Sequence, residues 1–189
     1  MVNTMERRLH IVSFDVPYPA DYGGVIDVYY KIKALADRGV SIILHCYQYG
    51  RPEQQELENL CEKVYYYPRL RGIFSALSPE PYIIYSRRSQ SLLSHLLEDD
   101  APILFEGLHT CHFLSHPALS NRLRIVRACN IEHEYYHYLA KGTRSLFKKL
   151  YFALESYRLR LFEKNLRYAH YILAITPRER DYFTHHYPG

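Results

Sequence analysis

Two kinds of hydrophobic pattern alternate along this chain. Short apolar runs, such as residues 8–14 (RLHIVSF), are typical of strands buried in a sheet. Longer segments repeat apolar positions every three or four residues, as Val25, Val28 and Ile32 do, which indicates a helix with one buried face. The predicted strands cover residues 8–14, 41–47, 64–67, 102–106, 123–128 and 171–175.

Helices are predicted between these strands. The first contains Val25 to Ala36, and Gly39 follows it where a C-cap glycine is common. Regular alternation of strands and helices predicts an α/β domain with a doubly wound, Rossmann-like, mostly parallel sheet. The chain length suits one such domain over residues 1–189. The other predicted helices cover residues 52–60, 86–98, 109–114, 131–140 and 144–168, and one starts at 178.

The longest predicted helix, residues 144–168, is amphipathic and basic. Its apolar stripe is expected to face the core. Basic amphipathic helices also dock on anionic membranes, but a solvated basic face is commoner and is the interpretation favoured here. The stripe consists of Leu146, Leu150, Ala153, Leu154, Tyr157, Leu161 and Leu166. The basic residues are Lys148, Lys149, Arg158, Arg160, Lys164 and Arg167.

Composition narrows the protein class. Hydrophobic residues make up 48% of the chain, which favours a globular fold over disorder. Residues 1–8 lack the apolar segment of a secretory signal, and the four cysteines form no CxxC pair, so reduced thiols in a cytoplasmic protein are expected. The net charge of +4 allows weak attraction to phosphates or anionic membranes. Because the basic residues are diffuse and no known motif accompanies them, nucleic acid is not an expected partner.

Candidate chemistry begins at the turn after the first strand, which ends in Gly23-Gly24. Glycines allow close approach of a ligand, and the N-terminus of the following helix favours a phosphate. The turn lacks both the GxGxxG and the P-loop pattern, and an ordinary strand–helix turn is the competing interpretation. After the fourth strand, His109 lies where it could contact a hydroxyl or accept its proton, or it is a loop histidine without a role.

Three segments carry the most specific motifs: residues 17–24 (PYPADYGG), residues 127–136 (RACNIEHEYY) and residues 163–176. The first resembles the opening of family 4 glycosyltransferases, which have the two-domain GT-B fold. The second resembles the fifth-strand loop of that family, often written R-x-H-N-x-E. The third resembles the helix and strand that close its N-terminal domain. In this order the motifs span nearly the whole chain.

The resemblance implies an acceptor-side domain, with the donor-binding C-terminal domain outside this chain. It implies transfer of a sugar from a nucleotide-sugar donor to a hydroxyl of a glycan or lipid-linked acceptor, usually with retention and without a metal. Peripheral contact at the inner face of the membrane fits such an acceptor, and the fragment alone is expected to be inactive. The implied donor phosphate-binding residues are Gly23 and Gly24, the acceptor-binding residues are Asp21, Glu106, Asn130 and Glu132, and the catalytic candidates are His109 and His133.

One residue departs from the family pattern. Cys129 stands where a histidine is expected before Asn130, so His109 or His133 could take that role.

A competing motif overlaps the same loop. His133-Glu134-x-x-His137 is a formal HExxH, which on a helix can hold zinc and activate water in a metallohydrolase. Glu155 or Glu163 could be the third ligand. Against this, Asn130 stands at the expected N-cap, so the motif falls in the first turns after a strand. A non-catalytic ligand-binding domain is the remaining alternative.

Overall fold

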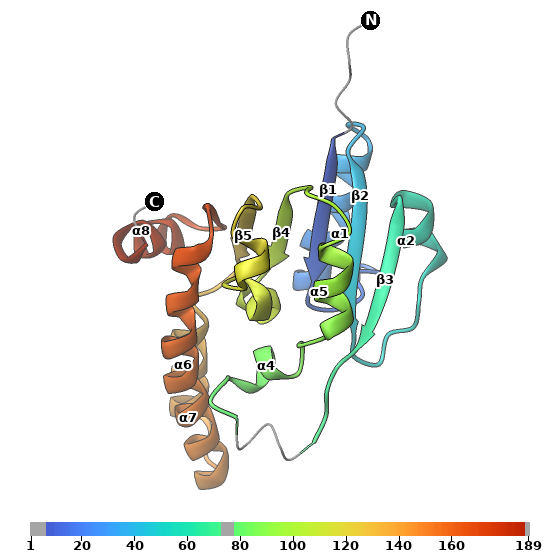
Figure 1. Ribbon diagram of the computed structural model, residues 1–189. Helices are drawn as coiled ribbons and strands as arrows, with labels where there is room; N and C mark the ends of the chain where they lie inside the picture. Colours follow the sequence, from blue (N-terminus) through green and yellow to red (C-terminus); the bar gives the residue numbers. More distant parts are fainter. Residues whose placement is uncertain (1–6, 73–77, 188–189) are drawn as a thin grey trace, which may run out of the picture.

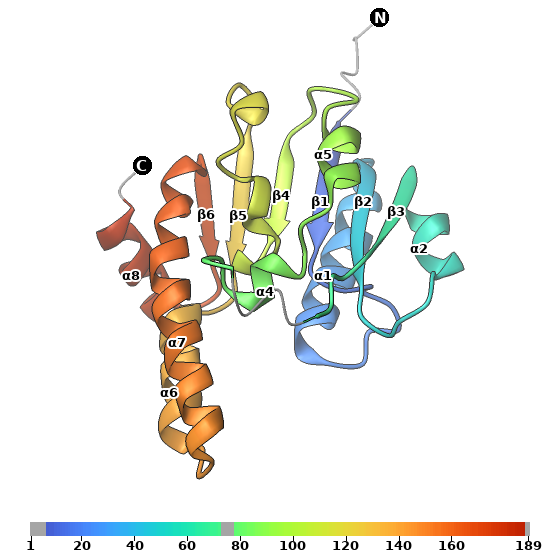
Figure 2. The same cartoon turned by 60° about the horizontal axis from the view of Figure 1, so that its bottom comes forward.

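The computed structural model describes residues 7–72 and 78–187. Most of residues 1–8, where no secretory signal is expected, therefore lies outside the described residues. The described chain forms a six-stranded sheet in the order β3-β2-β1-β4-β5-β6, and every pairing is parallel (Figures 1 and 2). The α/β prediction is confirmed. The strands are β1 (Arg8–Ser13), β2 (Ser41–Gln48), β3 (Lys63–Pro68), β4 (Ile103–Glu106), β5 (Arg124–Ala128) and β6 (Tyr171–Ala174).

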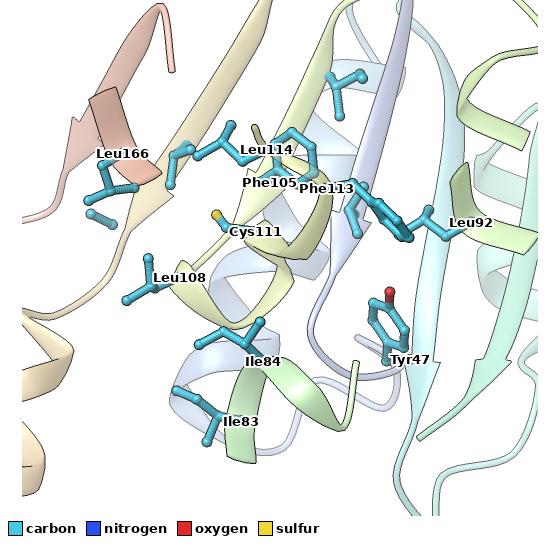
Figure 3. Close-up of a cluster of buried hydrophobic side chains, with 14 of the residues drawn as sticks. Tyr47, Ile83, Ile84, Leu92, Phe105, Leu108, Cys111, Phe113, Leu114 and Leu166 are labelled. Atoms are coloured by element: carbon cyan, nitrogen blue, oxygen red, sulfur yellow. The ribbon is translucent and has the colours of Figure 1, made fainter. Parts of the chain in front are cut away.

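Helices cover both faces of the sheet. Successive side chains of a strand point to opposite faces, so Ile11 packs in one core cluster and Val12 in the other. Figure 3 shows the cluster to which Val12 belongs, with Leu92, Phe105 and Leu114 among its labelled side chains. The helices are α1 (Gly23–Ala36), α2 (Gln55–Leu60), α4 (Tyr82–Tyr85), α5 (Gln90–Leu96), α6 (Glu132–Gly142), α7 (Leu146–Glu163) and α8 (Pro177–His186). Three 3-10 helices are η1 (Leu108–Phe113), η2 (Pro117–Leu119) and η3 (Lys164–Tyr168).

The predicted helix over residues 86–98 is wrong in its first four residues. The chain forms α4 before this segment and α5 within it, with Ser89 in an extended conformation at the N-cap of α5. The buried guanidinium of Arg87 donates to the carbonyl oxygens of Phe14 and Ile83. These bonds hold the chain between the two helices against the β1 loop, which local periodicity does not register.

The prediction that the apolar stripe of residues 144–168 faces the core is also wrong. Of that stripe only Leu166, which lies in η3, is buried, and the buried residues of α7 are Glu155, Leu159 and Glu163. The reason is that α7 packs along α6, and the pair extends as a hairpin beyond the sheet (Figures 1 and 2). Glu155 accepts a hydrogen bond from the Tyr82 N–H, which compensates its burial.

A chain of polar side chains crosses the α5 face of the sheet. Asp99 Oδ1 lies 2.9 Å from His10 Nε2, and His10 Nδ1 lies 2.8 Å from His45 Nε2. His45 Nδ1 then contacts the Tyr67 hydroxyl at 2.8 Å, and this hydroxyl contacts His95 Nδ1 at 2.8 Å. Burial lowers the pKa of His10 and, more strongly, that of His45. Both rings are therefore neutral near pH 7, and each can donate at one nitrogen and accept at the other.

The buried histidines in this series of hydrogen bonds make the stability of the folded protein depend on pH. Between the lowered pKa of folded His45 and the ordinary value of about 6.5, the unfolded state binds more protons, so stability falls as pH falls below about 6.5. His45 alone should remove about 1 kcal/mol of unfolding free energy between pH 6.5 and 5.5. Urea unfolding at a series of pH values measures this. His45→Gln should flatten the dependence, whereas His185→Gln on exposed α8 should not, and a flat wild-type profile would contradict the account.

Candidate functional site

The candidate site lies where the strands end. In the order β3-β2-β1-β4-β5-β6, the direction of winding reverses between β1 and β4. Ligands of such sheets bind in the crevice outside the carboxyl ends at this switch point. The loops that leave β1 and β4 flank it, and α4 and the free end of the α6–α7 hairpin lie on the same side (Figures 1 and 2).

Gly23 and Gly24 open α1 at this edge. A Cβ at Gly24 would lie 2.8 Å from Phe14 Cζ, so a larger residue would displace that ring, whereas Gly23 has no neighbour within 4 Å of such an atom. No side chain caps the helix and its first turn contains no acidic residue. The N-terminal N–H groups are thus free of a competing carboxylate, which suits an anion. Binding of the donor phosphate here stays a prediction.

His109 lies in η1, directly after β4. Gly107 has a φ of +77°, and a Cβ there would lie 2.9 Å from His109 Nδ1, so both backbone and space require glycine. The His109 ring packs on Phe14 with ring centroids 5.7 Å apart. Within the described residues, buried Nδ1 has no hydrogen-bond partner, and Glu132 Oε1 is 4.0 Å away. A buried polar atom without a partner is unusual and marks this nitrogen as a candidate for a ligand contact.

Glu132, the first residue of α6, is the carboxyl group of the site. Burial raises its pKa to about 7, against the opposing effects of a hydrogen bond from Asn130 and the positive charge of Arg87. Burial also lowers the pKa of His109, with Arg87 and Arg69 adding to the effect. The site therefore pairs a neutral imidazole with a carboxyl group that titrates near neutrality.

Asn130 is exposed and hydrogen-bonds Glu132, but it does not cap the helix. The N-cap of α6 is Ile131, so that expectation is corrected.

Arg87 is the member of the site that the sequence does not reveal. It is buried, its Nε lies 2.8 Å from the Phe14 oxygen, and its Nη1 lies 2.7 Å from the Ile83 oxygen. Burial lowers its pKa to about 10, so it remains charged at neutral pH. No pattern separates Arg87 from its neighbour Arg88, because only the tertiary fold buries one and exposes the other.

Two of the acceptor candidates form ion pairs of their own. Asp21 is exposed, and its Oδ1 lies 2.8 Å from Arg51 Nη1. Glu106 is fully buried, with Oε1 2.7 Å from Lys31 Nζ and Oε2 unpartnered among the described residues. An acceptor could reach Glu106 only after rearrangement, and both roles stay predictions.

His133 faces a different part of the molecule. Its Nδ1 lies 3.0 Å from Glu163 Oε2 on α7, and its ring lies near Tyr182 on α8. The structure thus brings His109, Asn130 and Glu132 together and directs His133 toward α7 and α8. A catalytic role for His133 is untested.

Cys129 differs from the histidine of the family pattern in its hydrogen-bonding chemistry as well as in identity. Burial and the nearby Glu106 raise the pKa of its thiol to about 11. The thiol is therefore neutral and a weak donor at best. Cys46, Cys61, Cys111 and Cys129 are all free.

The HExxH motif does not assemble a metal site in the described part of the chain. His133 pairs with Glu163, and Glu134 forms an ion pair with Arg178. Across residues 7–72 and 78–187, no group of three or more His, Cys, Asp or Glu side chains could hold a metal ion. His133, Glu134 and His137 instead line a groove of about 520 Å³ between α6 and α7. The metallohydrolase alternative gains no support from this arrangement.

A membrane span is absent from the part of the chain that the structure describes, since none of its helices is long and apolar enough.

The chain is similar in sequence to known proteins. It is 27% identical over 165 residues to an "uncharacterized 44.6 kDa protein in cps region" of Klebsiella pneumoniae. The alignment covers 84% of this chain and 42% of that relative, so the chain spans less than half of the relative's length. The sequence model of Glycosyltransferase Family 4 matches residues 23–188, which include Gly23, Gly24, His109 and Glu132. The chain belongs to glycosyltransferase family 4.

Proposed function

We propose that this chain is the acceptor-side domain of an enzyme that transfers a sugar from a nucleotide-sugar to a hydroxyl of a glycan or lipid-linked acceptor. The observation that carries the proposal is the pair of His109 and Glu132 at the switch point of the sheet, with His109 Nδ1 4.0 Å from Glu132 Oε1. Membership of glycosyltransferase family 4 supports the reaction class. The domain that binds the nucleotide would follow this one and close the cleft.

Each residue of the site has a role in the proposal. Neutral His109 would accept a hydrogen bond or a proton from the attacking hydroxyl at Nδ1, which has no partner among the described residues. Because this nitrogen is buried, the acceptor would reach it, as it would Glu106, only after rearrangement. Glu132 and Asn130 would bind neighbouring hydroxyls. The first-turn N–H groups at Gly23 and Gly24 would face the donor diphosphate. Catalysis would then rest on positioning and charge stabilisation, with retention and without a metal.

The biological setting is also part of the proposal. The Klebsiella relative is described as a protein of a cps region, and we extend this to a role in polysaccharide biosynthesis. A lipid-linked acceptor would place the protein in the cytoplasm at the inner face of a membrane, in peripheral contact with it.

The acceptor-side domain alone should be inactive. The 189-residue chain alone should release no nucleoside diphosphate from a panel of nucleotide-sugars, because most of the charge stabilisation would come from the donor-binding domain. The same chain joined to that domain should turn over one of them when acceptor is present. Turnover by the 189 residues alone would contradict the proposal that donor binding requires a second domain. Absence of turnover from the joined protein across the panel would favour a non-catalytic binding domain.

Substitution of His109 tests its role as proton acceptor. In the joined enzyme, His109→Asn should lower kcat by about 100-fold or more, the usual contribution of a general base. His112→Asn is the matched control, since His112 lies in the same 3-10 helix but pairs with Glu80 instead of Glu132. It should change kcat less than about threefold. Equal effects of the two substitutions would remove His109 from the chemistry and leave it a structural residue.

A further inference from the structure

The outward face of α7 is apolar, and no described residue of the chain covers it. Six large side chains of the helix, here called the α7 stripe, recur at spacings of one, three or four residues, which places them on one side. They are 82% (Phe147), 75% (Leu146), 66% (Leu150), 63% (Tyr157) and 47% (Leu154 and Leu161) exposed. Monomeric proteins rarely expose so continuous an apolar surface without an interaction that uses it.

Charge narrows the choice of partner. The two acidic residues of α7, Glu155 and Glu163, are buried on the inward side, where each accepts hydrogen bonds. The exposed charged side chains of α7 and of its C-cap are all basic: Lys148, Lys149, Arg160 and Lys164. A second copy of α7 packed on the stripe would bring these like charges together. An anionic bilayer surface instead offers an apolar interior for the stripe and phosphates for the basic residues.

Position gives a reason for such contact. The free end of the α6–α7 hairpin extends past the edge of the sheet where the strands end (Figures 1 and 2). His109 and Glu132 lie at that same edge. A protein held by the α7 stripe would therefore keep its candidate site next to the bilayer surface.

We propose that the α7 stripe lies in the plane of an anionic lipid bilayer surface and anchors the protein there. The interaction combines insertion of the apolar side chains with attraction between the basic residues and anionic headgroups. It extends the lipid-linked acceptor of the proposed function, but it needs neither donor nor turnover.

Sedimentation with lipid vesicles tests the anchor. The 189-residue chain should bind vesicles of phosphatidylcholine with phosphatidylglycerol, bind pure phosphatidylcholine at least tenfold more weakly, and dissociate as ionic strength rises. Leu154→Glu should reduce the partition coefficient about tenfold. The matched control is Leu97→Glu, which changes an equally exposed leucine, 47%, that lies after α5 and away from the hairpin. It should leave binding unchanged.

A second pair of variants tests the electrostatic component. The double variant Lys148→Gln, Lys149→Gln should bind anionic vesicles about 25-fold more weakly. Each basic residue near an anionic surface contributes about fivefold to binding, and the variant loses two. Lys33→Gln with Arg38→Gln removes two exposed charges at the end of α1 and should have no effect. Circular dichroism of each variant separates lost binding from lost folding.

Three results would overturn the anchor. They are no binding to anionic vesicles, equal loss with Leu154→Glu and Leu97→Glu, and a stable dimer in solution that Leu154→Glu dissociates. The dimer would assign the α7 stripe to a second copy. Because no sugar nucleotide is present, failure here leaves the transferase proposal untouched, and an inactive joined enzyme that still binds vesicles would leave the anchor standing.

Discussion

Because all six strands run parallel, every loop that leaves a strand at its carboxyl end emerges on the same edge of the sheet. This constraint brings together segments that are far apart in sequence: the loop after β1, the 3-10 helix after β4 and the first turn of α6. The reversal of strand order between β1 and β4 opens this edge to a ligand. The placement of His109 beside Glu132 depends on that arrangement, since the two residues belong to different strand ends.

The buried cation Arg87 affects the ionisation of both His109 and Glu132 at this edge. Arg87 remains charged while it is hydrogen-bonded to two backbone carbonyls, so its position is fixed by the β1 loop and by α4. Its charge favours the neutral form of His109 and opposes the effect of burial on Glu132. The same side chain thus holds Phe14 in place, against which the His109 ring packs. Loss of Arg87 would change both the geometry and the ionisation of the pair.

The elements that the sequence predicts correctly are those set by local pattern. The strands β1 and β5 begin and end within one residue of the predicted 8–14 and 123–128, because short apolar runs suit a sheet that is covered on both faces. The expectation that ligands bind where parallel strands end also predicts the position of His109, and the family resemblance adds Glu132 as a candidate beside it. The break before α5 and the role of Arg87 depend on contacts with the distant Phe14. The outward direction of the α7 stripe depends on α6, since periodicity predicts that a face exists but not what covers it.

The most direct test of the site is the ionisation of its two central groups. NMR titration of the 189-residue chain, with His109→Asn and Glu132→Gln used to assign the signals, follows the imidazole nitrogens and the carboxyl carbon. The account predicts that His109 stays neutral well below pH 6.5 and that Glu132 titrates at about 7. Protonation of His109 near 6.5, together with titration of Glu132 near its ordinary value of about 4.3, would show that neither group is held in the buried, Arg87-bordered environment described above.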